Sequence, residues 1–231
     1  MNLTKMLRSA GLAAGMVLAT NSVTFAEEGA DWLVPGNSFV YESTSPDYET
    51  SYYVDIYLGK IGPWMLFREL IQDDQPFVYA VTDYNVLFTE CDPSEYDDAA
   101  FLSMDYAEDT TAQIAALLPE DEIEVYDGLD GFTASLSDEF GFDVPGVSDT
   151  PILARTARLE YPGGGGLETF TTSRDGAALL EIDWGEESKD TLINIVETRT
   201  PLPEMTEERA RDVCPGIFED SSNPKNASKQ H

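Results

Sequence analysis

Hydrophobic and polar positions alternate in short segments between Ala157 and Glu197. From residue 178 to residue 184, apolar side chains recur at every second position, which is the period of a half-buried strand. Ser173–Gly176 has a glycine where a tight turn needs a positive φ angle. The stretch predicts four antiparallel strands joined by three tight connections, and we expect it to act as scaffold.

Four consecutive glycines, Gly163–Gly166, lie inside this stretch. They lack the Gly-Lys-Ser/Thr ending of a phosphate-binding P-loop and the GxGxxG spacing that precedes a helix. A strand-like sequence, Leu-Glu-Thr-Phe-Thr-Thr, follows them. The glycines therefore predict a hairpin loop.

A second alternating region begins at Phe39. Tyr53, Asp55 and Tyr57 share one face of a strand predicted over residues 52–58, and the opposite face is also largely apolar. The same pattern predicts neighbouring strands at residues 39–42, 64–70 and 77–84, with an extension at 86–88. These segments form a first β half.

The chain between the two β regions has a different composition. Half of all its acidic residues lie between residues 69 and 154, where there is no Lys or Arg. Ser94 predicts the N-cap of one helix, and Thr110–Gln113 matches a capping box for a second. Repeated Asp-Gly and Pro-Gly pairs make residues 119–150 loop-like. Residues 92–150 are thus expected to form a small acidic helical and loop insert.

Near the C-terminus, Thr206 predicts the N-cap of a short helix that ends near Cys214. The complete pattern predicts a mainly β (α+β) protein with an antiparallel sheet, sandwich- or barrel-like, in two β halves. The acidic helical insert separates the halves, and the short helix follows the second half.

The first 26 residues have the three parts of a signal peptide. Lys5 and Arg8 precede an apolar core that is far shorter than the roughly 20 residues of a bilayer span. Small side chains precede the expected cleavage site before Glu27. We expect export to the periplasm or the medium, with no transmembrane segment after cleavage. We also expect one domain over residues 27–217 and a disordered tail over residues 218–231.

The chain has two cysteines, Cys91 and Cys214. In an oxidising compartment, two cysteines of an exported chain most simply form one disulfide. The alternative is a pair of buried free thiols. An acidic environment disfavours a reactive thiolate.

The 13 basic and 44 acidic residues give a formal net charge of −31. Such a negative field repels nucleic acid, anionic lipid and phosphate-rich ligands. Three interpretations stay open: a strongly solvated surface, cation binding, and docking to a basic partner.

His231, the last residue, is the only histidine of the chain. Catalytic triads and zinc sites that use imidazole therefore have no histidine within the predicted domain. A hydrolase that works with paired carboxylates needs no histidine. Asp55 and Asp183 lie in apolar strands, where burial would raise a carboxyl pKa, although we expect both to face solvent.

Four acids beside Cys91 are candidate calcium ligands: Asp92, Glu95, Asp97 and Asp98. Asp127–Gly131 offers further oxygen ligands, and hard cations take several such oxygens. Neither segment has the DxDxDG spacing of a calcium loop, so a solvated helix start and an Asp-Gly turn are the simpler interpretations. No other cofactor is indicated.

Aromatic residues are concentrated in the first β half. One face of these strands must be core, and a second aromatic face would line a cavity or a docking surface. The candidate ligand-binding residues are Tyr53, Tyr57, Trp64 and Phe67. The sequence thus favours an exported, non-enzymatic binding protein for an unknown ligand or protein partner. The alternatives are a calcium-stabilised structural protein and a histidine-free carboxylate hydrolase.

Overall fold

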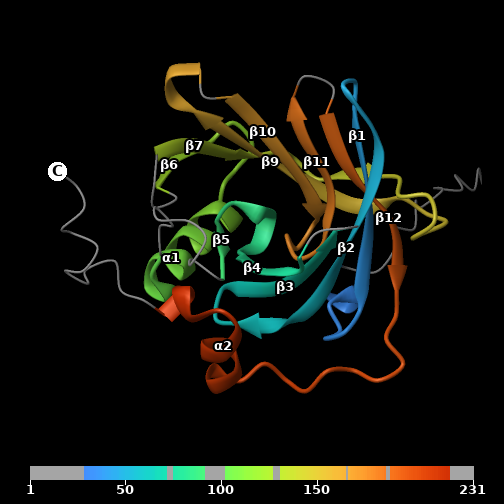
Figure 1. The fold of residues 1–231 in the computed structure, drawn as a ribbon. Coiled ribbons are helices and arrows are strands. Elements are labelled where there is room, and N and C mark those ends of the chain that lie inside the picture. Colours follow the sequence, from blue (N-terminus) through green and yellow to red (C-terminus); the bar gives the residue numbers. More distant parts are fainter. Residues whose placement is uncertain are drawn as a thin grey trace, which may run out of the picture.

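A computed structural model describes residues 29–71, 75–91, 102–126, 131–164, 166–185 and 188–218 (Figure 1). Within these ranges the strands form one antiparallel sheet of 12 strands. In chain order they are β1 (Ser38–Ser45), β2 (Tyr48–Ile61), β3 (Trp64–Ile71), β4 (Phe77–Val81), β5 (Phe88–Glu90), β6 (Glu122–Tyr126), β7 (Gly131–Leu136), β8 (Phe140–Phe142), β9 (Ile152–Tyr161), β10 (Gly166–Ser173), β11 (Leu179–Gly185) and β12 (Ser188–Val196).

Two short α-helices accompany the sheet, α1 (Met104–Ala115) and α2 (Glu207–Val213). The 3₁₀ turns are η1 (Gly29–Trp32), η2 (Asp83–Asn85), η4 (Pro162–Gly164) and η5 (Pro215–Phe218). The side chain of Thr206 accepts a hydrogen bond from the Arg209 backbone and caps α2, as its position predicts. The mainly antiparallel β class with two short helices is therefore confirmed.

The sheet has two halves, joined where β1 pairs with β12. The first β half comprises β1–β5, and the closing meander comprises β9–β12, with β7 and β6 beyond it. The order runs from β5 to β6, so the sheet is open. Figure 1 shows it curling round until β5 and β6 both lie near α1. The Tyr126 backbone N–H, at the end of β6, donates to the Tyr106 hydroxyl of α1 at 2.8 Å.

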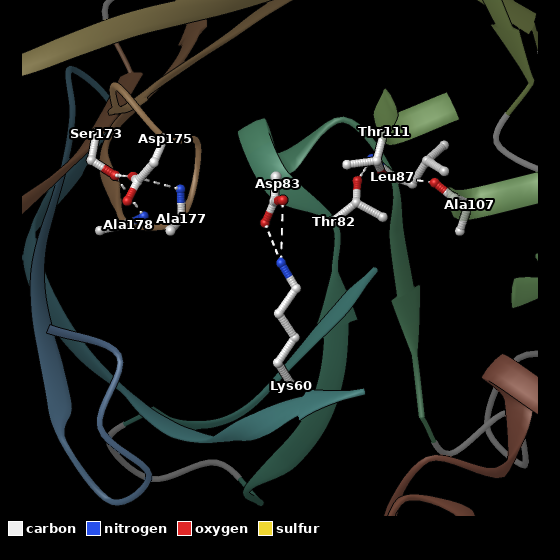
Figure 2. A network of polar contacts seen from close by, with 10 residues as sticks. All are labelled: Lys60, Thr82, Asp83, Leu87, Ala107, Thr111, Ser173, Asp175, Ala177 and Ala178. Carbon is white, nitrogen blue, oxygen red and sulfur yellow. Dashed lines mark hydrogen bonds and ion pairs between the residues drawn. The ribbon is translucent and has the colours of Figure 1, made fainter. Parts of the chain in front are cut away.

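A loop after β4 crosses the inside of the curl and meets the turn between β10 and β11. The Tyr84 backbone N–H donates to the Gly176 carbonyl at 2.8 Å, and the Tyr84 hydroxyl donates to the Arg174 carbonyl at 3.1 Å. Gly176 has a φ of +76°, and a Cβ there would lie 2.9 Å from the Tyr84 ring. Both the positive φ angle and the close approach of the Tyr84 ring therefore require glycine at this position of the turn, as the sequence predicts. Figure 2 shows the ion pair between Lys60 of β2 and Asp83 of the same loop.

Cys91 and Cys214 form the predicted disulfide and are 123 positions apart in the chain. It joins the end of β5 to the end of α2. Both cysteines are buried in the same hydrophobic cluster as Ile114 of α1. The bridge therefore fastens the edge of the first β half to the two helices.

The region between the two halves differs from its prediction in two ways. Residues 119–150 are expected to be loop-like but contain β6, β7 and β8. Thr110 is expected to cap a helix but lies buried inside α1, whose N-cap is Ser103. The Ser103 hydroxyl accepts a hydrogen bond from the Tyr106 backbone, so the true cap stands one residue before the helix.

Several predictions concern parts of the chain outside the described residues. This group contains the signal peptide of residues 1–26, the Ser94 cap and the tail after residue 218. Within the described ranges, no helix combines the length and the apolar character needed to cross a membrane.

Candidate functional site: a cavity inside the curled sheet

A cavity of about 780 Å³ lies within the curl of the sheet. Its volume falls within the roughly 300–1,000 Å³ of typical small-molecule sites. Most of its lining is apolar or aromatic: Tyr52, Tyr53, Ile71, Phe77, Tyr79, Val86, Phe88, Phe132, Leu159, Tyr161, Phe170, Leu179, Ile182 and Trp184. The charged lining residues are all acidic: Asp55, Glu69, Glu90, Glu168 and Asp190. Among the described lining residues there is no Lys or Arg, so any ionised side chain of this lining carries negative charge.

Strand register places the acids of the first β half beside aromatic rings. Asp55 of β2 pairs with Glu69 of β3, and Tyr79 of β4 pairs with Glu90 of β5. Side chains of directly paired residues project to the same face of a sheet. The four side chains therefore all point into the cavity from consecutive strands.

Asp55 is the most buried acid of the cavity, with 3% of its surface exposed. Its Oδ2 accepts a hydrogen bond from the Tyr79 hydroxyl at 2.7 Å, whereas its Oδ1 is buried without a hydrogen-bond partner. Burial raises the pKa of Asp55 to about 8, and the charges of Glu69 and Asp190 add to the rise while the Tyr79 bond opposes it. The expectation that Asp55 faces solvent is wrong.

Two further acids act on Asp55: Glu69 of the neighbouring strand β3, and Asp190 of β12, which lies beyond β1. Burial, followed by the charges of Asp190 and Glu90, raises the pKa of Glu69 to about 7. Asp190 of β12 is buried, and its Oδ2 accepts from the Tyr53 hydroxyl at 3.3 Å and from Trp184 Nε1 at 3.0 Å. Three of the five lining carboxyl groups, from β2, β3 and β12, therefore interact electrostatically with one another.

Large apolar side chains stay exposed where the cavity opens. Tyr52, Phe88, Trp184 and Ile71 have exposed fractions of 54%, 50%, 46% and 39%, and all four line the cavity. Exposed apolar surface that gathers around a concave site is typical of a ligand-binding groove. These four residues are called the apolar rim below.

The predicted ligand residues do not all reach the cavity. Tyr53 lines it. Tyr57, Trp64 and Phe67 are buried in the core and do not line it. Phe67 stacks on Tyr79, which does line the cavity, at 5.6 Å between ring centroids. A ligand role for Tyr53 stays a prediction. Phe67 packs beside a lining residue, and Tyr57 and Trp64 belong to the buried core.

The other predicted acids lie elsewhere. Asp183 is half-buried outside this cavity, and a hydrogen bond from the Gly185 backbone lowers its pKa. The calcium candidates Asp92, Glu95, Asp97 and Asp98 lie outside the described residues, as does most of Asp127–Gly131. No cluster of three or more His, Cys, Asp or Glu side chains that would hold a metal occurs in the described ranges.

Several lining residues were not expected from the sequence. The closing meander, predicted to be scaffold, contributes Phe170, Ile182, Trp184 and Asp190 to the cavity. Glu69 and Tyr79 of the first β half were also missed as site residues. The alternation along their strands indicates the face on which Glu69 and Tyr79 lie, so the sequence contains a signal for their placement.

Comparison with known proteins yields little for this chain. No family model matches it, and no curated protein matches it. Among solved structures, it is similar to MucB in complex with MucA(peri) and to the MucA/MucB complex of Pseudomonas aeruginosa. Both matches have 11% identity and a TM-score of 0.33, and both cover 78% of this chain. They cover 60% and 59% of the other chains, so this chain spans about three fifths of their length. A TM-score this low carries no argument about fold or function.

Proposed function

We propose that this protein is an exported, non-enzymatic binding protein that takes an apolar or amphipathic small molecule into its curled sheet. The observation that carries the proposal is the cavity of about 780 Å³, lined mainly by aromatic and aliphatic side chains. Protein interiors are otherwise packed with few voids larger than a water molecule. A space of this size with an apolar wall is the default binding site of a protein.

The apolar rim supports the same function. Tyr52 belongs to β2 and Trp184 to β11, so each half of the sheet contributes an exposed aromatic ring to the cavity lining. Apolar surface exposed to water costs free energy, about 25 cal/mol for each Å² that a ligand would cover. Covering this rim and the wall behind it is the driving force for binding.

The test uses a neutral, environment-sensitive dye, N-phenyl-1-naphthylamine, with the oxidised mature chain. We expect saturable binding of one dye per chain. Ile182→Trp fills part of the cavity and should reduce dye binding, because Ile182 is a buried wall residue. Leu118→Trp is the matched control, since Leu118 is 66% exposed and does not line the cavity. Failure of the wild-type chain to bind the dye, or equal binding by both variants, would contradict the proposal.

A second candidate function is hydrolysis by paired carboxyl groups. The observation that favours it is the meeting of Asp55, Glu69 and Asp190 in one cavity, where the first two have raised pKa values. An acid of raised pKa beside a second carboxylate is the arrangement of general acid and base in glycosidases. Turnover of chromogenic glycosides by the wild-type chain, lost in Asp55→Asn, would establish this candidate. Absence of turnover across such a panel would remove it.

A further inference from the structure

Asp55 is a buried carboxyl group with one oxygen that lacks a partner. Tyr79 donates to its Oδ2, and within the described part of the chain its buried Oδ1 has no hydrogen-bond partner. A buried carboxyl oxygen without a donor is unfavourable, since it has lost its water and gained nothing in return. Asp55 lines the cavity, but its Oδ1 has almost no accessible surface, so a donor on a bound ligand reaches this oxygen once the Asp55 side chain turns toward the cavity.

The surrounding charges decide what kind of donor fits best. Glu69 is the direct cross-strand neighbour of Asp55, and Asp190 acts on both acids from β12. The lining residues include no basic side chain among those described. A cation in this cavity meets opposite charge from several strands, whereas an anion is repelled.

We propose that the ligand carries a protonated amine on an apolar body, and that the amine donates to Asp55 Oδ1 with Glu69 and Asp190 beside it. The apolar body then lies against the Phe170 and Ile182 side of the cavity. This inference rests on the proposed binding function and gives it a ligand class. A charged donor to a carboxylate forms a stronger hydrogen bond than a neutral donor does.

Proton release gives an independent signature. Asp55 is faced by Tyr41 of β1, Glu69 of β3, Tyr79 of β4 and Asp190 of β12, none of which is cationic. With a pKa of about 8 in the empty cavity, Asp55 is mostly protonated at pH 7. An alkylamine, with a pKa near that of lysine at about 10.4, arrives as a cation. Its binding favours the carboxylate of Asp55, so up to about one proton leaves for the solvent.

The experiment displaces the neutral dye with three ligands that share one tail: decylamine, decan-1-ol and decanoate. For the wild-type chain we expect decylamine to bind about tenfold more tightly than decanol, since hydrogen bonds to charged groups are the stronger ones. Decanoate should bind least. Titration calorimetry in buffers of different ionisation enthalpy should detect proton release with decylamine and none with decanol.

Asp55→Asn keeps the size of the side chain and removes its charge. It should bind decylamine and decan-1-ol with similar affinity and should release no proton with the amine. Asp183→Asn is the matched control, because Asp183 lies on a neighbouring part of the sheet outside the cavity, and it should keep both the preference for the amine and the proton release. Glu69→Gln is a second variant in case Asp55→Asn does not fold, and it should weaken the preference. Equal affinity for amine and alcohol in the wild-type chain, or an undiminished preference in Asp55→Asn, would overturn the inference. Loss of dye binding by the wild-type chain would instead contradict the binding function itself.

Discussion

The first β half and the closing meander both curve around the cavity, but they contribute different chemistry to it. From β2 to β5, the first half supplies Asp55, Glu69 and Glu90 among aromatic rings. The meander supplies a wall that is mainly apolar, with Phe170 and Ile182. Its two lining acids are Glu168 on β10 and Asp190 on β12, the strand at the junction between the halves. One half holds most of the polar chemistry, and the other holds much of the surface on which an apolar body can lie.

This difference shows that scaffold and site are not separate parts of the molecule. Asp190 is 137 residues from Tyr53 in the chain, yet the pairing of β1 with β12 brings the two side chains into a hydrogen bond. Trp184 of the meander donates to the same carboxyl oxygen. The site therefore exists only when both halves are assembled.

The largest expected effect comes from the disulfide, which joins the end of β5 in the first half to the end of α2 and closes a loop that contains the meander. Replacing Cys91 and Cys214 by serine removes a constraint between two positions that are 123 apart in the chain. The chain-entropy model gives about 4–5 kcal/mol for such a closure, as an upper figure. Urea denaturation of the variant should show a free energy of unfolding lower by up to that amount. The reduced wild-type chain should behave in the same way, and unchanged midpoints in both would disprove the structural role of the bridge.

Replacing one phenylalanine by alanine in each half compares the packing of the two halves directly. Phe67 is packed among Phe39, Tyr57 and Tyr79 in the first half, so Phe67→Ala should cost about 3–5 kcal/mol of stability. Phe170 is equally buried but borders the cavity, so Phe170→Ala should cost about 1.5–3 kcal/mol, the transfer of the ring alone. Chemical denaturation measures both. A greater loss in Phe170→Ala would show that the meander wall is closed core.

The dependence of stability on pH tests the acids of the first half. The pKa of Asp55 rises from 3.8 to about 8 on folding, so the folded state binds the proton more tightly than the unfolded state does. The contribution of Asp55 to stability is therefore complete below pH 3.8 and is lost as the pH rises through about 8. One such group changes the free energy of unfolding by at most about 1.4 kcal/mol per pH unit.

The measurement compares urea midpoints of the wild-type chain, Asp55→Asn and Asp183→Asn between pH 5 and pH 9. Asp55→Asn should lose less stability than the wild-type chain as the pH rises. Asp183→Asn should not share this flattening, because the pKa of Asp183 is lowered in the folded state. Parallel curves for the wild-type chain and Asp55→Asn would show that Asp55 does not hold its proton.

The smallest expected effect concerns the apolar rim. Trp184 packs edge-on against Phe170 and donates to Asp190, so Trp184→Ala should weaken dye binding by about 1 kcal/mol, which is roughly fivefold. Tyr48→Ala is the control in the first half, since Tyr48 is exposed and does not line the cavity. Fluorescence titration with the dye measures the affinity of both variants. Equal dye affinities of the two variants would show that the apolar rim does not belong to the binding site.

Most of the fold could be predicted because alternation has a direct physical cause. A strand with one buried face requires apolar side chains at every second position, and β2 and β11 both show this. The strands β6 and β8 are short, and frequent glycines and acids around them favoured loops. They form because β7 and β9 offer edges with which they can pair, and no local pattern reveals such partners.

The cavity could be predicted only in part. Alternation puts Asp55 on the face of Tyr53 and Tyr57, but the opposite face, with Val54 and Ile56, is also apolar. The sequence therefore could not decide which face is interior, and Asp55 was expected in solvent. The contribution of Asp190 depends on the closure of β1 on β12, which is a long-range pairing that local patterns do not give.

The central claim is that the curled sheet encloses a binding cavity whose polar end is Asp55. A crystal structure of the oxidised mature chain grown with decylamine tests it most directly. We expect the amine nitrogen at about 3 Å from Asp55 Oδ1 and the alkyl chain along the wall formed by Phe170 and Ile182. A cavity that stays free of ligand while decylamine binds elsewhere, or one filled by the protein's own side chains, would contradict it.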